Sequence, residues 1–322
     1  MLENQFAHVV ALIKDARNSA LRTVNSALIN LYWNIGEYIH VKVNNAEWGQ
    51  SVVKQLADFL STQEPHLKGF SDKNLWRMKQ FYENYKDFPK LSPLVREISW
   101  TNNLIILSRT KSIDEQEFYL KLSKQENYSK RELDRQISAG IFERTIIGNT
   151  KLSAVLREMH QDIESNFKDS YVFEFLNLPE PHNENDLQKS LILQMKNFIL
   201  ELGKDFLFID EEYKIQVGNS DFYIDLLFYH RGLQCLVAFE LKVDKFKPEH
   251  LGQINFYLEA LDRDVKKSNE NPSIGILLCK DKDNEVVEYA LSRSLSPTLV
   301  SEYKTQLPDK KLLQQRIHEL FK

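Results

Sequence analysis

The sequence predicts an α+β protein of two domains, in which a helical domain precedes an α/β domain with a mixed central sheet flanked by helices. Its 322 residues are enough for two hydrophobic cores. Apolar residues recur every three or four positions up to about Glu143, whereas short runs typical of strands follow Leu178. We therefore expect a helical domain over residues 1–170 and a sheet-containing domain over residues 171–322.

The first domain has the pattern of a helical bundle, with apolar residues at Ala20, Val24, Ala27, Leu28, Leu31 and Ile35. Breaks are expected near Asn44–Asn45, Pro65–Phe70 and Pro89–Pro93. Ser71 is a candidate cap for a short helix after a glycine-containing turn. That helix could bind in a groove of DNA, but a helix with this pattern is more often an additional member of the helical bundle. Apolar spacing around Val24 and Leu31 is likewise more typical of an internal core than of an interface.

The second domain alternates between helices and strands. A polar, proline-rich segment at residues 178–185 indicates a domain edge, and Gly203 is a suitable stop for the helix that follows. We expect helices at Leu187–Leu202, Pro248–Val265 and Glu285–Ser292, a terminal helix, and strands at Phe206–Ile209, Tyr213–Val217, Phe222–Tyr229, Leu233–Val243, Ile274–Cys279 and Leu299–Tyr303. Antiparallel strands followed by alternating elements predict a mixed sheet.

Charge and composition exclude some classes of protein. The net charge is −4, with +2 on residues 1–170 and −6 on residues 171–322. We therefore do not expect the protein to bind nucleic acid through its overall charge alone. No apolar run approaches the roughly 18 residues of a membrane span, and we expect a cytoplasmic protein. Cys235 and Cys279 lack the paired spacing of a zinc site and are predicted to be buried free thiols.

Three charged residues lie within apolar strand-like runs. Asp225 and Glu240 are predicted to need partners there, because an unpaired buried charge is costly. Glu240 and Lys242 are two residues apart on one strand and project from the same face, and the Arg231-Gly232 turn could bring Asp225 beside them. Two carboxylates and a lysine are the groups that metal-assisted phosphodiester hydrolysis uses. These residues therefore predict a hydrolytic metal site.

The next helix adds a second pattern, since Gln253 and Tyr257 are four residues apart and share a face. Each also has a purely structural interpretation. Gln253 could only cap the helix or form a local hydrogen bond, and Tyr257 could only pack the helix against its neighbours. Asp221 and Glu212 could assist a metal, but a turn residue and a solvated strand residue are the more common interpretations. His230, beside a turn, is more typical of a surface histidine than of a base.

With these motifs the chain resembles the PD-(D/E)XK nuclease superfamily, whose fold is restriction-endonuclease-like, and more closely the bacterial YhcG-like family. The resemblance includes GFSDKNLWRMKQFY in the first half and DFYIDLLFYHRGLQCLVAFELK in the second, and it runs through almost the whole chain. It implies a helical amino-terminal domain, with a winged helix as one form it could take, followed by a nuclease domain.

The resemblance implies that Asp225 and Glu240 bind metal, that Lys242 acts on water and phosphate, and that Gln253 supports the site. The helix opening the family's nuclease domain typically reads Asp-Leu-Glu, whereas Gln188 stands in the place of the glutamate here. A neutral amide leaves the second metal ion in doubt, and Glu184 is close enough in sequence to substitute.

Two functions follow as expectations. The first is a Mg²⁺-dependent DNA endonuclease, with Mn²⁺ able to replace Mg²⁺, whose helical domain binds DNA, forms a homodimer, or both. The second is a non-catalytic DNA-binding or assembly subunit that uses the nuclease fold as a platform, because a fold alone does not guarantee activity.

Overall fold

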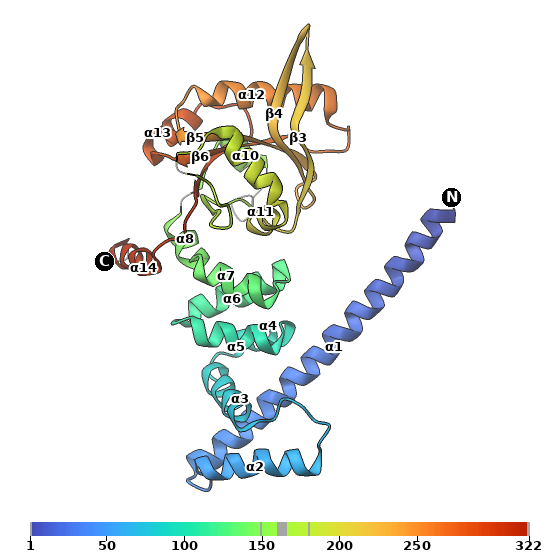
Figure 1. Ribbon diagram of the computed structural model, residues 1–322, viewed down its shortest axis with the longest axis vertical. Coiled ribbons are helices and arrows are strands. Elements are labelled where there is room, and N and C mark those ends of the chain that lie inside the picture. Colours follow the sequence, from blue (N-terminus) through green and yellow to red (C-terminus); the bar gives the residue numbers. More distant parts are fainter. Residues whose placement is uncertain (1, 149, 160–165, 180, 321–322) are drawn as a thin grey trace. The chain divides into compact units, whose positions relative to one another are not determined.

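The computed structural model describes residues 2–148, 150–159, 166–179 and 181–320 (Figure 1). The chain forms two compact units, residues 1–137 and 138–322. The functional boundary expected at residue 170 stays a prediction. Among the described residues, none of the helices combines the length and the apolar character that a bilayer span requires.

The first unit is helical. Its elements are α1 (Leu2–Asn44), α2 (Gln50–Gln63), α3 (Asp72–Tyr85), a 3₁₀ turn (Pro89–Leu91), α4 (Ser92–Glu97), α5 (Trp100–Arg109), α6 (Ile113–Glu126) and α7 (Lys130–Ser138), which ends one residue into the second unit. Between residues 2 and 137 the structure contains no strand, so the β-hairpin of a winged helix is not seen there. The predicted breaks after residue 44, before α3 and before α4 are confirmed.

Helix α3 packs closely against α1. A Cβ atom at Gly36 would collide with the carbonyl oxygen of Met78, so glycine permits this close approach. The face of α3 that carries Leu75, Met78 and Phe81 is buried, which makes α3 a bundle helix. Its opposite face, with Lys73, Arg77 and Gln80, is exposed.

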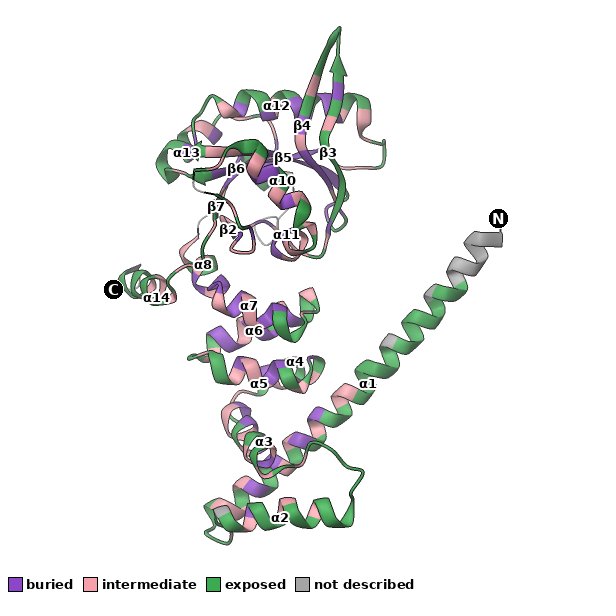
Figure 2. Ribbon diagram, in the orientation of Figure 1, coloured by how far each residue is buried: buried purple, intermediate pink, exposed green. Residues whose placement is uncertain are grey.

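Helix α1 also carries apolar residues on a second side that is exposed. Figure 2 shows exposed residues of α1 in green over much of the described helix. Tyr32 is buried, but Val24 is 66% exposed and Leu31 is 44% exposed. The assignment of Val24 and Leu31 to an internal core was therefore wrong, because the core of this unit contacts the other side of α1, at residues such as Ile29.

The second unit is built on a mixed sheet, whose described strands run in the order β1-β7-β6-β5-β4-β3, with β2 beside β7. Strand β4 is antiparallel to both β3 and β5, whereas β5, β6 and β7 are parallel, so the sheet is mixed, as the sequence predicts. The strands are β1 (Lys151–Leu152), β2 (Ser170–Val172), β3 (Phe206–Val217), β4 (Ser220–His230), β5 (Cys235–Lys245), β6 (Ile274–Asp281) and β7 (Thr298–Lys304). The helices are α8 (Ile141–Ile147), α9 (Ala154–Met159), α10 (Glu184–Leu193), α11 (Met195–Leu202), α12 (His250–Ala260), α13 (Asn284–Leu291) and α14 (Lys310–Leu320).

Helices cover both faces of the sheet. Leu187 of α10 and Phe198 of α11 belong to the core on one face, whereas Ile254 of α12 and Val287 of α13 belong to the core on the other. Cys235 and Cys279 lie in these two separate cores, and both are buried free thiols, as predicted.

Two elements differ from their predicted form. The helix expected at residues 187–202 is divided at Gln194, where the backbone leaves the helical region. The two strands expected at residues 206–209 and 213–217 are one strand, β3, whose register against β4 shifts between Phe208 and Asp210. This bulge interrupts the alternation of side chains and so mimics a chain break in the sequence.

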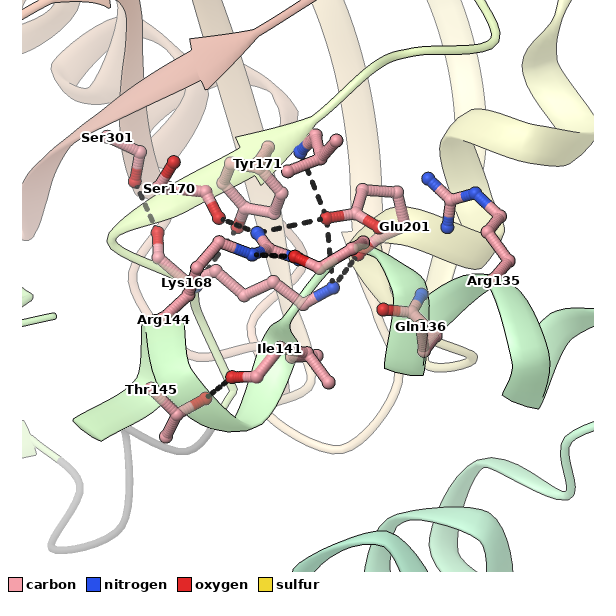
Figure 3. Close-up of polar contacts among 12 residues, drawn as sticks. Arg135, Gln136, Ile141, Arg144, Thr145, Lys168, Ser170, Tyr171, Glu201 and Ser301 are labelled. Atoms are coloured by element: carbon pink, nitrogen blue, oxygen red, sulfur yellow. Dashed lines mark hydrogen bonds and ion pairs between the residues drawn. The ribbon is translucent and has the colours of Figure 1, made fainter. Parts of the chain in front are cut away.

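A buried polar cluster connects α8, α11, β2 and β7 (Figure 3). The fully buried Glu201 carboxylate accepts a hydrogen bond from the Val172 amide at 3.1 Å and lies 3.3 Å from Lys168 Nζ and 3.6 Å from Arg144 Nη1. Ser301 Oγ of β7 donates to the Lys168 carbonyl at 2.7 Å. Because breaking a buried ion pair leaves an uncompensated charge, this cluster holds the helices to the edge of the sheet.

Candidate active site

The pairing of β4 with β5 brings Asp225 and Glu240 together. Leu226 faces Phe239 in this antiparallel ladder, and the next pair in the same register is Asp225 and Glu240. Residues directly opposite each other point to the same face of a sheet. Asp225 Oδ2 also accepts a hydrogen bond from the Leu241 amide at 2.7 Å, so its carboxylate lies against β5 beside Glu240.

Glu240 and Lys242 form an ion pair on β5. Lys242 Nζ lies 2.9 Å from Glu240 Oε1, as expected for side chains two residues apart on one strand. Glu240 is 2% exposed, and its other oxygen, Oε2, is buried without a hydrogen-bond partner. A buried carboxylate oxygen without a donor is costly unless a cation or another donor reaches it.

The electrostatic environment is unusual for carboxylates. Burial raises the pKa of Asp225 to about 6, although the Leu241 hydrogen bond and the Lys242 charge act in the opposite direction. Burial, together with the negative charge of Asp225, raises the pKa of Glu240 to about 7, against the opposing effect of Lys242. Both groups therefore release their protons more easily when a positive charge is added near them.

Lys242 keeps its proton. Burial lowers its pKa, but the hydrogen bond to Glu240 and the charges of Glu240, Glu184 and Asp225 outweigh burial, so the pKa is raised. Lys242 can therefore orient water and neutralise phosphate charge, but it is not suited to act as the base.

Helix α10 contributes two side chains to this region. Gln188 Nε2 donates a hydrogen bond to the backbone carbonyl of Asp225 at 2.9 Å. Glu184, in the first turn of α10, lies 3.4 Å from Lys242 Nζ. Glu184 is thus the carboxylate that α10 brings to Lys242, and Gln188 positions β4.

Helix α12 contributes the Gln253–Tyr257 pair. Gln253 Nε2 donates to Tyr257 Oη at 2.8 Å, while the Tyr257 ring packs in the core. Burial raises the pKa of Tyr257, Gln253 opposes this shift, and the charges of Glu240 and Asp225 contribute to it. The tyrosine hydroxyl therefore lies within the electrostatic range of both carboxylates.

Both halves of the chain match known protein families. A family model described as the YhcG PDDEXK nuclease domain matches residues 164–318, and one described as the DUF1016 N-terminal domain matches residues 8–144. The nuclease-named protein YhcG of Escherichia coli (strain K12) is 32% identical over 347 residues, which cover 95% of this chain and 90% of that protein. The chain belongs to the YhcG family. It carries a PDDEXK nuclease domain with the restriction-endonuclease-like fold that the sequence predicts.

The chain is also similar to a solved structure, that of a repair endonuclease from Pyrococcus abyssi. It is 16% identical and covers 41% of this chain and 50% of its own chain, with a TM-score of 0.27.

The carboxylates of this YhcG-family member fit a hard divalent cation. PDDEXK nucleases usually use divalent metals, and oxygen atoms are the ligands that Mg²⁺ prefers. Glu240 Oε2 is a buried oxygen without a donor, beside a second carboxylate on Asp225. Among the described residues, His, Cys, Asp and Glu form no preformed group of three or more ligands.

His250 is a residue near this site that the sequence interpretation missed. It is the first residue of α12, three residues before Gln253 and seven before Tyr257, so all three share one face of the helix. Burial and the charge of Lys242 are the main causes that lower its pKa. The i, i+3, i+7 spacing was the signal that could have identified it.

The other candidates lie elsewhere or have other surroundings. Asp221 pairs with Lys214 at 2.7 Å beside the β3–β4 turn. Glu212 is exposed, has a φ of +46°, and its charge contributes to the raised pKa of Asp225. His230 is 2% exposed, so its description as a surface histidine was wrong. Its ring packs edge-on against Phe206, and its Nδ1 accepts a hydrogen bond from the Leu233 amide at 3.1 Å.

Proposed function

We propose that this protein is a Mg²⁺-dependent endonuclease that hydrolyses phosphodiester bonds in DNA. The observation that carries the proposal is the arrangement of Asp225 and Glu240 at the same position of two paired strands, with Lys242 bound to Glu240. Family membership supports nucleic-acid hydrolysis, and the buried, partnerless Glu240 oxygen supports the metal.

The residues divide the chemistry among them. Asp225 and Glu240 would hold the cation, which when bound stabilises the charge that develops on the phosphate and makes water a better nucleophile. Lys242 would orient the attacking water and neutralise phosphate charge. Gln253 would support the site from α12, where Tyr257 fixes its amide. Mn²⁺ should replace Mg²⁺, because it accepts the same oxygen ligands.

The decisive experiment is cleavage of plasmid DNA by purified protein with Mg²⁺ or Mn²⁺. Asp225→Asn, Glu240→Gln and Lys242→Gln should each remove cleavage. Asp221→Asn is the matched control, because Asp221 is on the same strand as Asp225 but pairs with Lys214. Cleavage that persists in the three variants at the wild-type rate would refute the assignment.

A second function is favoured by the environment of Gln188 and Glu184. Gln188 supplies a neutral amide to the site, and the only α10 carboxylate beside Lys242 in the described structure, that of Glu184, is already its ion-pair partner. A platform protein that binds DNA or assembles with partners without cutting would tolerate this arrangement. Salt-dependent DNA binding without cleavage under any divalent metal would support this second function over the first.

We also propose that the helical unit forms a homodimer through α1. Val10, Val24, Leu31 and Tyr38 are exposed at intervals of seven or fourteen residues, and Ile13, Ala20, Ala27 and Val41 follow the same repeat three residues later. The stripe spans about 47 Å at 1.5 Å per residue. A second copy of α1 fits this surface, because the seven-residue repeat is that of a two-stranded coiled coil. Two nuclease units in one assembly would match the two scissile phosphates of a duplex.

DNA contact by the helical unit is proposed for the exposed face of α3. Lys73, Arg77 and Gln80 recur at intervals of four and three residues, so they share one side of the helix. Basic and amide side chains on one helix face are suited to phosphate and base contacts.

A further inference from the structure

His250 lies where α12 begins, beside the proposed catalytic site. Its imidazole shares a helix face with Gln253 and Tyr257, and the charges of Lys242 and Glu184 both affect it. Phe246 packs against the ring in an edge-on arrangement, with the ring centroids 6.2 Å apart. The ring is therefore held in place on the side of α12 that carries the other two site residues.

The hydrogen bonds of the ring determine what it can offer to a ligand. The Lys247 amide donates to His250 Nδ1 at 3.3 Å, so Nδ1 is an acceptor. In the neutral ring the proton is then on Nε2. Neither nitrogen has a free lone pair, so this tautomer is a hydrogen-bond donor and not a metal ligand.

Several groups keep the ring neutral. Burial, Lys242 and Lys247 lower the pKa of His250, and they outweigh Glu249 and Glu184, which raise it. The amino-terminal end of a helix also disfavours a cation. A neutral donor next to a cationic lysine fits an acceptor that carries negative charge.

We propose that His250 contacts the substrate, and that its Nε2–H donates a hydrogen bond to a non-bridging oxygen of a DNA phosphate bound beside Lys242. This inference depends on the proposed nuclease function. Phosphate oxygens only accept hydrogen bonds, so the donor on His250 and the ammonium group of Lys242 complement the same group. The contact orients the strand, and it strengthens as negative charge accumulates on the phosphate during hydrolysis.

Three variants test the proposal. His250→Leu removes the donor, His250→Gln keeps a neutral N–H donor, and His318→Leu is a control at an exposed histidine of α14. His250→Leu should lower kcat about 100-fold, His250→Gln should recover most of that loss, and His318→Leu should match the wild type. The dissociation constant for Mn²⁺, measured without DNA, should be unchanged in all three.

The outcomes separate this inference from the proposed function. Equal kcat in wild type and His250→Leu would overturn the inference, as would a loss of Mn²⁺ affinity in His250→Leu, because a metal ligand would then be lost. If the wild type cuts no DNA with Mg²⁺ or Mn²⁺, the nuclease proposal fails. The affinity for duplex DNA, measured in the presence of Ca²⁺, then tests the contact between His250 and phosphate. His250→Leu should then bind about tenfold more weakly than His318→Leu, and equal affinities would overturn the contact.

Discussion

The side-chain amide of Gln188 donates a hydrogen bond to the backbone carbonyl of Asp225 at 2.9 Å. This contact connects α10 with the strand position that carries the proposed metal ligand. A glutamate at position 188 would place an acceptor against an acceptor, because an ionised carboxylate has no proton to donate. We expect Gln188→Glu to lower the free energy of unfolding of the metal-free protein by about 1–3 kcal/mol, measured by thermal or denaturant unfolding.

Gln63→Glu is the matched control, because residue 63 is exposed at the end of α2. It should leave unfolding unchanged. If Gln188→Glu proves as stable as this control, the Gln188 amide does not position Asp225.

The two raised carboxyl pKa values predict how stability depends on pH. Asp225 has a pKa of about 6 and Glu240 a pKa of about 7, against ordinary values near 4. The folded state therefore holds protons that the unfolded state has released. Their contribution is fully present below about pH 4 and is lost as pH rises through 6 to 7. The metal-free protein should become less stable across this window, as followed by thermal unfolding.

A divalent cation should reverse this trend, because it stabilises the ionised carboxylates. Added Mg²⁺ should raise the midpoint of thermal unfolding more at about pH 8 than at about pH 5. The double variant Asp225→Asn/Glu240→Gln should lose both the pH effect and the Mg²⁺ effect. An unchanged pH profile in that variant would assign the titration to other groups.

The convergence of Asp225, Glu240 and Lys242 could be predicted because strand alternation and a short turn determine it. Glu240 and Lys242 are two residues apart, and the turn after His230 sets Asp225 opposite Glu240. Other features depend on tertiary contacts that no local pattern encodes. His230 is buried because Phe206 and Phe167 pack around it, and Val24 is exposed because the core formed on the other side of α1.

The hydrogen bond between Gln253 and Tyr257 predicts that the two residues act as one unit. Tyr257→Phe removes the hydroxyl that receives the Gln253 amide, and Gln253→Ala removes the amide itself. Each variant should lower cleavage, and the double variant should lose no more than the larger single loss. Tyr289→Phe, at a tyrosine that is 76% exposed, serves as the control. Additive losses in kcat would show that the two side chains contribute independently.

The exposed face of α3 predicts a change in salt dependence. Lys73→Glu/Arg77→Glu should weaken binding of duplex DNA and lower the slope of log affinity against log salt by about two, one for each phosphate contact. The control double variant Lys54→Glu/Lys130→Glu changes charge equally at exposed positions on α2 and α7. An equal loss of affinity in both double variants would mean that only overall charge matters.

The exposed stripe of α1 predicts the oligomeric state. Val24 and Leu31 occupy the same position of the seven-residue repeat, where a coiled coil buries its apolar side chains. Val24→Glu/Leu31→Glu should convert a dimer into a monomer, measured by light scattering at micromolar concentration. Ser19→Glu/Arg22→Glu adds two carboxylates to exposed positions of the same helix outside the stripe, and it should remain dimeric.

Because the apolar stripe also contains Arg17 and Asn34, and polar residues at such positions select one register, a wild-type dimer should have a single defined pairing of its helices. A wild-type protein that is monomeric at this concentration would show that another partner, or solvent, covers the stripe.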